Sequence, residues 1–316
     1  GSNLRPYTKS AAEKEIATIA YLEADWFVLG EMNYPKMLSV MEDAPPVIIT
    51  KGNNHLFQKP CVAMVGARNA SAVGRKLASV IAADLGKEGY IVVSGLARGI
   101  DTAAHQAALS SGTIAAIAGG INVVYPRENA DLQDAISRQG LVVTEMPPGT
   151  KPQATYFPRR NRIIAGLSMG VIIVEAAARS GSLITARLAA EAGREVMAVP
   201  GSPMDPRAQG TNSLIRNGAT LVEDAQDVID NLRGLQRLDL GEAIVPEFRT
   251  DIMTNREPSE NERSRIVEAL GFTAVSVDEI IRSCELDASI AAIILLELEL
   301  AGKIERHAGN RVSLTA

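Results

Sequence analysis

Short apolar runs of strand length alternate with helical patterns between Pro60 and Leu232. The runs are rich in Val, Ile, Leu and Ala, as strands are when both faces of their sheet are covered. This alternation predicts an α/β domain with a Rossmann-like, doubly wound and mostly parallel sheet between two layers of helices. The expected strands are Val62–Val65, Ile91–Ser94, Ile114–Ala118, Leu141–Thr144, Val171–Val174, Val196–Val199 and Thr220–Val222.

Several of these strands end in a small or glycine-rich turn that opens a helix. The first two turns are Gly66–Ser71 and Ser94–Gly99. In parallel sheets ligands bind at the carboxyl ends of strands, where glycines let backbone N–H groups and helix N-termini approach an anion. Because Arg68 and Arg98 lie in these turns, we expect both side chains at the same rim of the sheet.

The turns do not match the common nucleotide-binding motifs. The sequence has no G-x-x-x-x-G-K-[ST], and no G-x-G-x-x-G follows the first strand, which argues against a P-loop ATPase and an ordinary dinucleotide fold. A hydrolase built on Ser94 or Ser182 with Asp101 and His105 is an alternative. Asp101 and His105 are four residues apart on one expected helix, however, and an Asp near a helix start is usually a cap or compensates the helix dipole.

A basic segment follows the fourth strand. Pro147–Leu188 holds six basic residues against one acid, Glu175, in a chain whose formal net charge is −5. Within it, Phe157–Gly166 places three arginines beside an aromatic ring, and Tyr156 stands directly before them in a chain with only 4% aromatic residues. Arginines fix phosphates and rings stack bases, so the segment suits single-stranded nucleic acid. Surface ion pairs and core rings are the alternative interpretation.

Length and composition limit the remaining possibilities. The 316 residues are enough for two or three domains. No apolar run reaches the roughly 20 residues that cross a bilayer, and no secretory leader is evident, so we expect a cytoplasmic protein without membrane contact. Cys61 and Cys284 are far apart and the three histidines are scattered, so we expect neither a disulfide nor a metal or cofactor. The chain starts with Gly1-Ser2 and no Met, which suggests missing upstream sequence.

Charge and periodicity divide the chain into four parts. Residues 1–59 form a lead-in, 60–240 the Rossmann-like domain and 241–258 a linker with two prolines. Residues 259–316 read as a small winged-helix-like domain with three helices and a hairpin near Gly309-Asn310. The tail from residue 257 carries six basic and eleven acidic residues, so it alone makes the chain acidic.

The third helix of this tail, Ala288–Ala301, would read DNA in a winged helix. It is apolar nearly all round and its only charges are Glu297 and Glu299. An acidic, apolar helix is poorly suited to a major groove, so protein contact or packing is the favoured role.

Several motifs in series resemble the DNA-processing protein A (DprA, also called Smf) family. They keep that family's order and cover roughly Tyr34 to Leu232. The motifs are Met64–Arg68, Val93–Asp101, Phe157–Ser168, Glu175-Ala176, Arg179–Arg187, Val199–Pro203 and Gly210–Ile215.

The resemblance implies a non-catalytic role: binding single-stranded DNA during natural transformation, protecting it, and helping RecA load where single-strand-binding protein would block it. It also implies a homodimer and a basic pocket on the Rossmann-like domain. Matching by motif assigns DNA binding to Arg68, Phe157, Arg159, Arg160 and Arg162, with Gly66, Ser94 and Gly95 shaping the pocket floor. Arg98 joins them from its turn, and Lys151 from charge alone.

The sequence departs from the family's pattern in two places, and two functions of other classes are alternatives. The helix-hairpin-helix-like region often found at the family's N-terminus is absent or cut off here, and the first turn reads Gly-Ala-Arg where many members have Gly-Ser-Arg, so Ala67 lacks a hydroxyl. A phosphoribohydrolase of the related Rossmann group is an alternative, although its Pro-Gly-Gly-x-Gly-Thr-x-x-Glu loop has no counterpart after Glu175. An effector-controlled transcription factor would rest on the winged helix alone.

Overall fold

The structure is a computed structural model that describes residues 8–239, 258–271, 273–284, 286, 288–307 and 311–315. Two compact units divide the chain, residues 1–240 and 241–316. The expected linker, 241–258, lies outside the described residues apart from Pro258.

The first unit is built on one mixed sheet, which has nine strands within the described residues. Its order is β1-β2-β6-β5-β4-β3-β7-β8-β9, and all neighbours from β6 to β9 run parallel. The parallel strands confirm the apolar runs to within two residues at each end. They are β3 (Cys61–Val65), β4 (Ile91–Ser94), β5 (Thr113–Ala116), β6 (Leu141–Thr144), β7 (Gly170–Ile173), β8 (Glu195–Ala198) and β9 (Thr220–Leu221).

The lead-in extends this sheet. Strand β2 (Val47–Gly52) pairs antiparallel with β6, and β1 (Asp25–Val28) pairs antiparallel with β2. Residues before 60 therefore belong to the same sheet as the Rossmann-like domain, because β2 supplies the backbone partners that the edge of β6 would otherwise lack.

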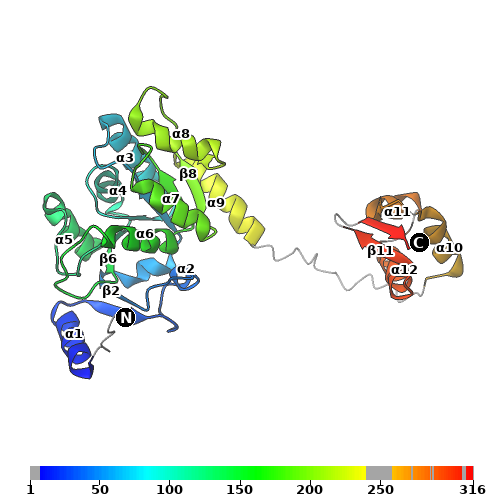
Figure 1. The fold of residues 1–316 in the computed structure, drawn as a ribbon, viewed down its shortest axis with the longest axis horizontal. Helices are drawn as coiled ribbons and strands as arrows, with labels where there is room; N and C mark the ends of the chain where they lie inside the picture. The colour runs from blue at the N-terminus through cyan, green and yellow to red at the C-terminus, as the bar shows by residue number, and fades with distance from the viewer. Residues whose placement is uncertain are drawn as a thin grey trace, which may run out of the picture. The chain divides into compact units, whose positions relative to one another are not determined.

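Helices cover both faces of the sheet (Figure 1). Alternate residues of β3 point to opposite sides: Ala63 and Val65 pack with α6 and α7, whereas Val62 and Met64 pack with α3, α4 and α9. The helices are α1 (Lys9–Tyr21), α2 (Lys36–Ser39), α3 (Ala72–Lys87), α4 (Ile100–Ala108), α5 (Ala130–Gln139), α6 (Tyr156–Leu167), α7 (Ser182–Glu191), α8 (Gln209–Arg216) and α9 (Ala225–Asp239), with 3₁₀ turns η1 (Asn54–Gln58), η2 (Arg127–Asn129) and η3 (Pro206–Ala208).

The strand order reverses between β3 and β7. Ala63 of β3 pairs with Val93 of β4 on one side and with Val171 of β7 on the other. The chain leaves β3 toward β4 and returns from β6 to β7 on the opposite side, so the carboxyl ends of β3 and β7 flank a topological switch point. Ligands of open α/β sheets bind at such a point.

The second unit has three helices and a three-stranded antiparallel sheet, counted over the described residues. Its elements are α10 (Glu260–Ala269), β10 (Val275–Ser276), α11 (Val277–Ser283), α12 (Ala288–Leu300), β11 (Ile304–His307) and β12 (Arg311–Leu314). Ser259 and Glu262 form the capping box that their spacing predicts. The expected turn at Gly309-Asn310 lies outside the described residues.

Helix α12 buries one side in the core of this unit. Ile290, Ile294 and Leu295 are buried, whereas Leu296 and Leu300 are exposed. Its Glu297 accepts hydrogen bonds from Arg263 of α10 at 2.9 and 3.0 Å. The exposed side of α12 therefore combines apolar and acidic groups, which suits DNA phosphates poorly.

Candidate nucleic-acid interface

The glycine turns after β3 and β4 each donate hydrogen bonds to one of the protein's own carboxylates. After β3, the backbone N–H and the hydroxyl of Ser71 donate to the Glu175 carboxylate at 2.9 and 2.5 Å. After β4, the N–H groups of Gly95 and Ala97 donate to Asp101 Oδ2 at 3.1 and 3.2 Å. These internal carboxylates therefore take the backbone N–H groups of Ser71, Gly95 and Ala97, which a bound phosphate would otherwise use. Positive charge at this rim comes from side chains instead.

Phe157, in the first turn of α6, is the centre of a cationic cluster. The Arg68 guanidinium carbon lies 5.4 Å from the centre of its ring, and that of Arg160 lies 5.9 Å away. Both distances are within the range of cation–π attraction. Arg68 is exposed, and no hydrogen bond or ion pair to another described residue holds its guanidinium. It is therefore free to meet an anion from solvent.

The guanidinium of Arg160 is held in place by backbone carbonyl groups. Its side chain is buried, and its Nη1 donates to the carbonyl oxygens of Gly95 and Ala116, the latter at 2.5 Å. A Cβ on Gly95 would lie 2.5 Å from that same nitrogen, so only glycine leaves room for the arginine. Burial lowers the pKa of Arg160 to about 10; Asp101 opposes this shift and Arg68 adds to it. The group remains a cation at neutral pH, fixed in place before any ligand arrives.

The other two arginines of α6 turn away from Phe157. Arg162 is buried and pairs with Glu145, and it also donates to the backbone oxygen of Asp43 in the lead-in. Arg159 is largely exposed and lies 3.3 Å from the same Glu145 carboxylate. Arg162 thus ties α6 to the lead-in, and its assignment to DNA binding stays a prediction.

Two adjoining cavities open at this rim. The first, of about 520 Å³, and the second, of about 470 Å³, share a wall made by Arg68, Phe157 and Arg160. The first is bounded by Ile117, Val123, Val124, Tyr125, Pro126 and Pro152, with Arg98 and Arg127 at its edge. The polar side chains that line the second are those of Asn69, Asn161, Arg179, Ser180, Ser182 and Thr185, together with charged groups. Both volumes fall within the usual range for ligand pockets.

The remaining predicted residues divide between the cavities and the surrounding structure. Gly95 and Arg98 line the first cavity and Gly66 lines the second. Arg98 is exposed and lies 3.7 Å from Glu128. Ser94 does not shape the floor, because its hydroxyl donates to the Met64 carbonyl oxygen inside the sheet at 2.6 Å. Lys151 is exposed and lines neither cavity.

Tyr125 is the ring that sequence reasoning missed. Its ring centre is 5.5 Å from that of Phe157, although the two residues come from different connections of the sheet. Tyr156, which the sequence placed beside Phe157, lines neither cavity because consecutive residues of a helix point in different directions. The available signal was Val123-Val124-Tyr125, an apolar run just after the Gly119-Gly120 turn.

His105 does not form an accessible acid–base pair with Asp101. The imidazole is fully buried, and its Nδ1 lies 2.8 Å from Thr113 Oγ1. Burial, with a smaller contribution from Arg160, lowers the pKa of His105 to about 3. Asp101 lies in the first turn of α4 and accepts from the backbone N–H groups of Gly95 and Ala97, so it holds the preceding turn. No helix among the described residues is both long and apolar enough to span a membrane.

Comparison with known proteins matches both units. The family model described as "DNA recombination-mediator protein A" covers residues 25–233, and the "DprA winged helix domain" covers residues 253–310. The chain belongs to the DprA/Smf family. The family thereby assigns it a role in DNA processing as a recombination mediator, and confirms the winged helix in the second unit.

Similar proteins and structures support this membership. DNA processing protein DprA of Streptococcus pneumoniae is 50% identical over 198 residues, 62% of this chain and 70% of that protein. Protein Smf of Escherichia coli is 37% identical over 291 residues, 89% of this chain and 75% of that protein. The S. pneumoniae DprA crystal structure has a TM-score of 0.66 at 45% identity, covering 71% of this chain and 77% of the other.

A DprA/Smf structure from Helicobacter pylori connects the family to a ligand. It has a TM-score of 0.60 at 30% identity and covers 66% of this chain and 96% of that one. That structure is described as giving insight into the single-stranded DNA binding mode of the H. pylori protein.

Proposed function

We propose that this DprA/Smf member binds single-stranded DNA without regard to sequence, at the two cavities around Phe157. The observation that carries the proposal is the wall of Arg68, Phe157 and Arg160 between the cavities. It offers guanidiniums for phosphates and a ring for bases, which are the two elements of sequence-tolerant strand binding. A duplex keeps its bases stacked inside and cannot place them against this ring.

Single-strand binding would serve recombination. We propose that the protein protects strands taken up in natural transformation and loads RecA on them in the cytoplasm where single-strand-binding protein would compete. It would do so as a homodimer and without catalysis. Membership in a family of recombination mediators and the strand binding named for the H. pylori protein support this role.

The 195–232 region is a candidate dimer surface, because it exposes Met204 and Leu221. A charge reversal in this region, followed by a measurement of molecular mass in solution, would test this assignment.

A phosphoribohydrolase fits the site less well. Such an enzyme must hold the phosphate of a mononucleotide, and Glu175 and Asp101 already occupy the two turns that would do so. A carboxylate in that place repels a phosphate. If the protein released free base from nucleoside monophosphates, that activity would support this alternative.

The test compares an oligothymidine with a duplex of equal length at two salt concentrations. We expect tighter, salt-dependent binding of the single strand, with a log–log slope near −0.7 per phosphate neutralised. Arg68→Ala should weaken binding about tenfold and make the slope shallower by roughly 0.7. Arg68 is preferable to Arg160 for this purpose because removal of Arg160 would leave buried carbonyl groups unpaired.

Arg187→Ala is the matched control. Arg187 lies in the same basic segment, but its exposed side chain pairs with Glu191 and lines neither cavity. It should bind oligothymidine within about twofold of the wild type, since exposed ion pairs contribute little. Equal affinities for Arg68→Ala and the wild type would show that the cavities are not the binding site.

A further inference from the structure

An acidic side chain lies in the wall of the first cavity. Glu128 is the one carboxylate among the described residues that line this cavity. The same cavity is lined by four arginines, Arg68, Arg98, Arg127 and Arg160. A carboxylate in this position works against the attraction of the arginines for phosphate.

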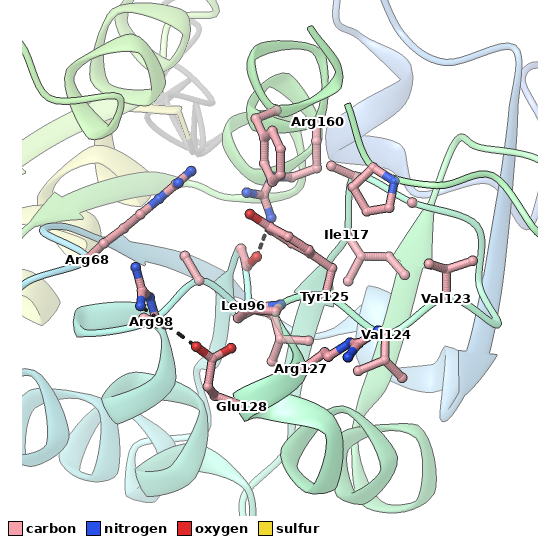
Figure 2. Close-up of a pocket in the computed structure, with 17 residues that line it drawn as sticks. Arg68, Leu96, Arg98, Ile117, Val123, Val124, Tyr125, Arg127, Glu128 and Arg160 are labelled. Carbon is pink, nitrogen blue, oxygen red and sulfur yellow. Dashed lines mark hydrogen bonds and ion pairs between the residues drawn. The ribbon is translucent and has the colours of Figure 1, made fainter. Parts of the chain in front are cut away.

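Glu128 pairs with one of these arginines. Figure 2 shows the side chains of Arg98 and Glu128 turned toward one another, and Arg98 Nη1 lies 3.7 Å from Glu128 Oε1. Arg68, which lines the same cavity, has no such partner within the described part of the chain. The carboxylate therefore lies at one guanidinium of the rim, in the place where a phosphate of the strand would bind.

Asn129 fixes the turn that carries Glu128 to the turn that carries Arg98. The Asn129 side chain is buried, and its Nδ2 donates to the carbonyl oxygen of Leu96 and to Thr102 Oγ1, both at 2.9 Å. The two backbones are therefore held beside one another, whereas the Arg98 and Glu128 side chains are 57% and 62% exposed. An ion pair this exposed contributes little free energy, so a phosphate can displace the carboxylate.

We propose that Glu128 competes with the bound strand for Arg98 and so limits how tightly the strand is held. In the free protein the carboxylate pairs with the Arg98 guanidinium, and a backbone phosphate takes its place when the strand binds. When the phosphate leaves, Glu128 returns to Arg98 and favours dissociation. A protein that passes a strand to another protein has to release it, and this competition keeps release fast. This inference rests on the proposed single-strand binding.

The experiment is a double-mutant cycle of Glu128 and Arg98 with fluorescent oligothymidine as the ligand. Glu128→Gln, Arg98→Ala and the double variant are compared with the wild type in equilibrium affinity and in dissociation rate. Asp131→Asn is the matched control. Asp131 is exposed in the first turn of α5, close to Glu128 in the chain, and lines neither cavity.

We expect Glu128→Gln to bind about threefold more tightly and to dissociate more slowly by a similar factor, since it removes one exposed, competing ion pair. Arg98→Ala should bind about threefold more weakly than the wild type. In the Glu128→Gln background the same change should cost roughly ninefold, because the arginine is then fully available to phosphate. Asp131→Asn should stay within about 1.5-fold of the wild type at about 0.15 M salt, where exposed charges are screened.

Unchanged or weaker binding by Glu128→Gln would overturn the competition, while strand binding would stand because the wild type binds. The inference also fails if Glu128→Gln gains as much affinity in the Arg98→Ala background, or if Asp131→Asn gains equally. Either result would mean that the carboxylate acts through the general field and not through Arg98. If the wild type does not bind oligothymidine, the proposed function itself fails.

Discussion

At the scale of single residues, the site depends on how one guanidinium is fixed. Arg160 reaches the carbonyl oxygens of Gly95 and Ala116, which lie 65 and 44 residues earlier in the chain. Gly95 makes this approach possible because a side chain there would collide with the guanidinium. Because the charge of Arg160 is already held in place, DNA binding would lose less conformational entropy in ordering this side chain.

Gly95→Ala should therefore damage stability and binding together. The added methyl group has to push Arg160 away from its carbonyl partners, and such overpacking typically costs about 1–3 kcal/mol in the free energy of unfolding. Denaturant unfolding checks this value, and oligothymidine affinity should fall as well. Gly181→Ala is the stability control, because a Cβ there meets nothing within 4 Å. Equal stability of the two variants would mean that Arg160 is not held as described.

Replacement of Arg162 should lower stability, whereas replacement of Arg68 should weaken DNA binding and leave stability nearly unchanged. Arg162→Ala leaves the buried Glu145 carboxylate with only the more distant Arg159, so we expect a loss of about 3 kcal/mol in the free energy of unfolding. Arg68→Ala removes an exposed charge and should change that free energy by less than about 0.5 kcal/mol. A stability loss for Arg68→Ala as large as that for Arg162→Ala would contradict the two roles.

At the scale of elements, α6 presents two faces. Phe157 and Arg160 are three residues apart and share the face toward the cavities, while Arg159 and Arg162 share the face toward Glu145. Helix α4 packs on the opposite side of the sheet and places a neutral imidazole, His105, in the core. Arg160 of α6 is thus a buried cation that lines the cavities, whereas His105 of α4 is a buried polar group of the core.

The buried His105 should make stability depend on pH. Its pKa of about 3 in the folded protein lies below the ordinary value of 6.5. As pH falls below about 6.5, His105 binds a proton in the unfolded chain but stays neutral in the folded protein. Protonation therefore stabilises the unfolded state, and the free energy of unfolding falls. Between pH 7 and pH 5 we expect His105→Gln to lose about 1–2 kcal/mol less than the wild type in urea titrations. Parallel pH profiles for the two proteins would show that His105 is not a buried neutral group.

At the scale of the whole molecule, charge is segregated between the parts. All of the net charge of −5 lies in the tail from residue 257, since the 26 basic and 26 acidic residues before it balance. The basic segment and both cavities lie in the first unit. Negative charge of this kind disfavours the approach of an anionic strand.

Removal of residues 257–316 should speed the association of oligothymidine at low salt. Removing net negative charge favours the approach of an anion, and the difference should vanish at high salt where the field is screened. Stopped-flow association rates at two ionic strengths measure this effect, with the equilibrium affinity at high salt expected to stay within about threefold. A large loss of affinity at high salt would place DNA contacts in the removed segment.

The sequence alone determined the parallel sheet, the winged-helix elements, the basic segment and the family. Hydrophobic periodicity, turn residues and motif order are local properties, so they can be recognised in the sequence without the tertiary structure. The positions of Arg68 and Arg98 at one rim followed from the rule that strands of a parallel sheet end on the same side.

Only the tertiary structure decided which groups line the cavities. Glu175 and Asp101 fill the glycine turns, Arg162 turns to Glu145, and Tyr125 replaces Tyr156 as the partner of Phe157. Each of these pairings depends on the packing of a helix against the sheet, which sets the direction of every side chain on it. Such directions are fixed by contacts between distant segments, and no local pattern in the chain records them.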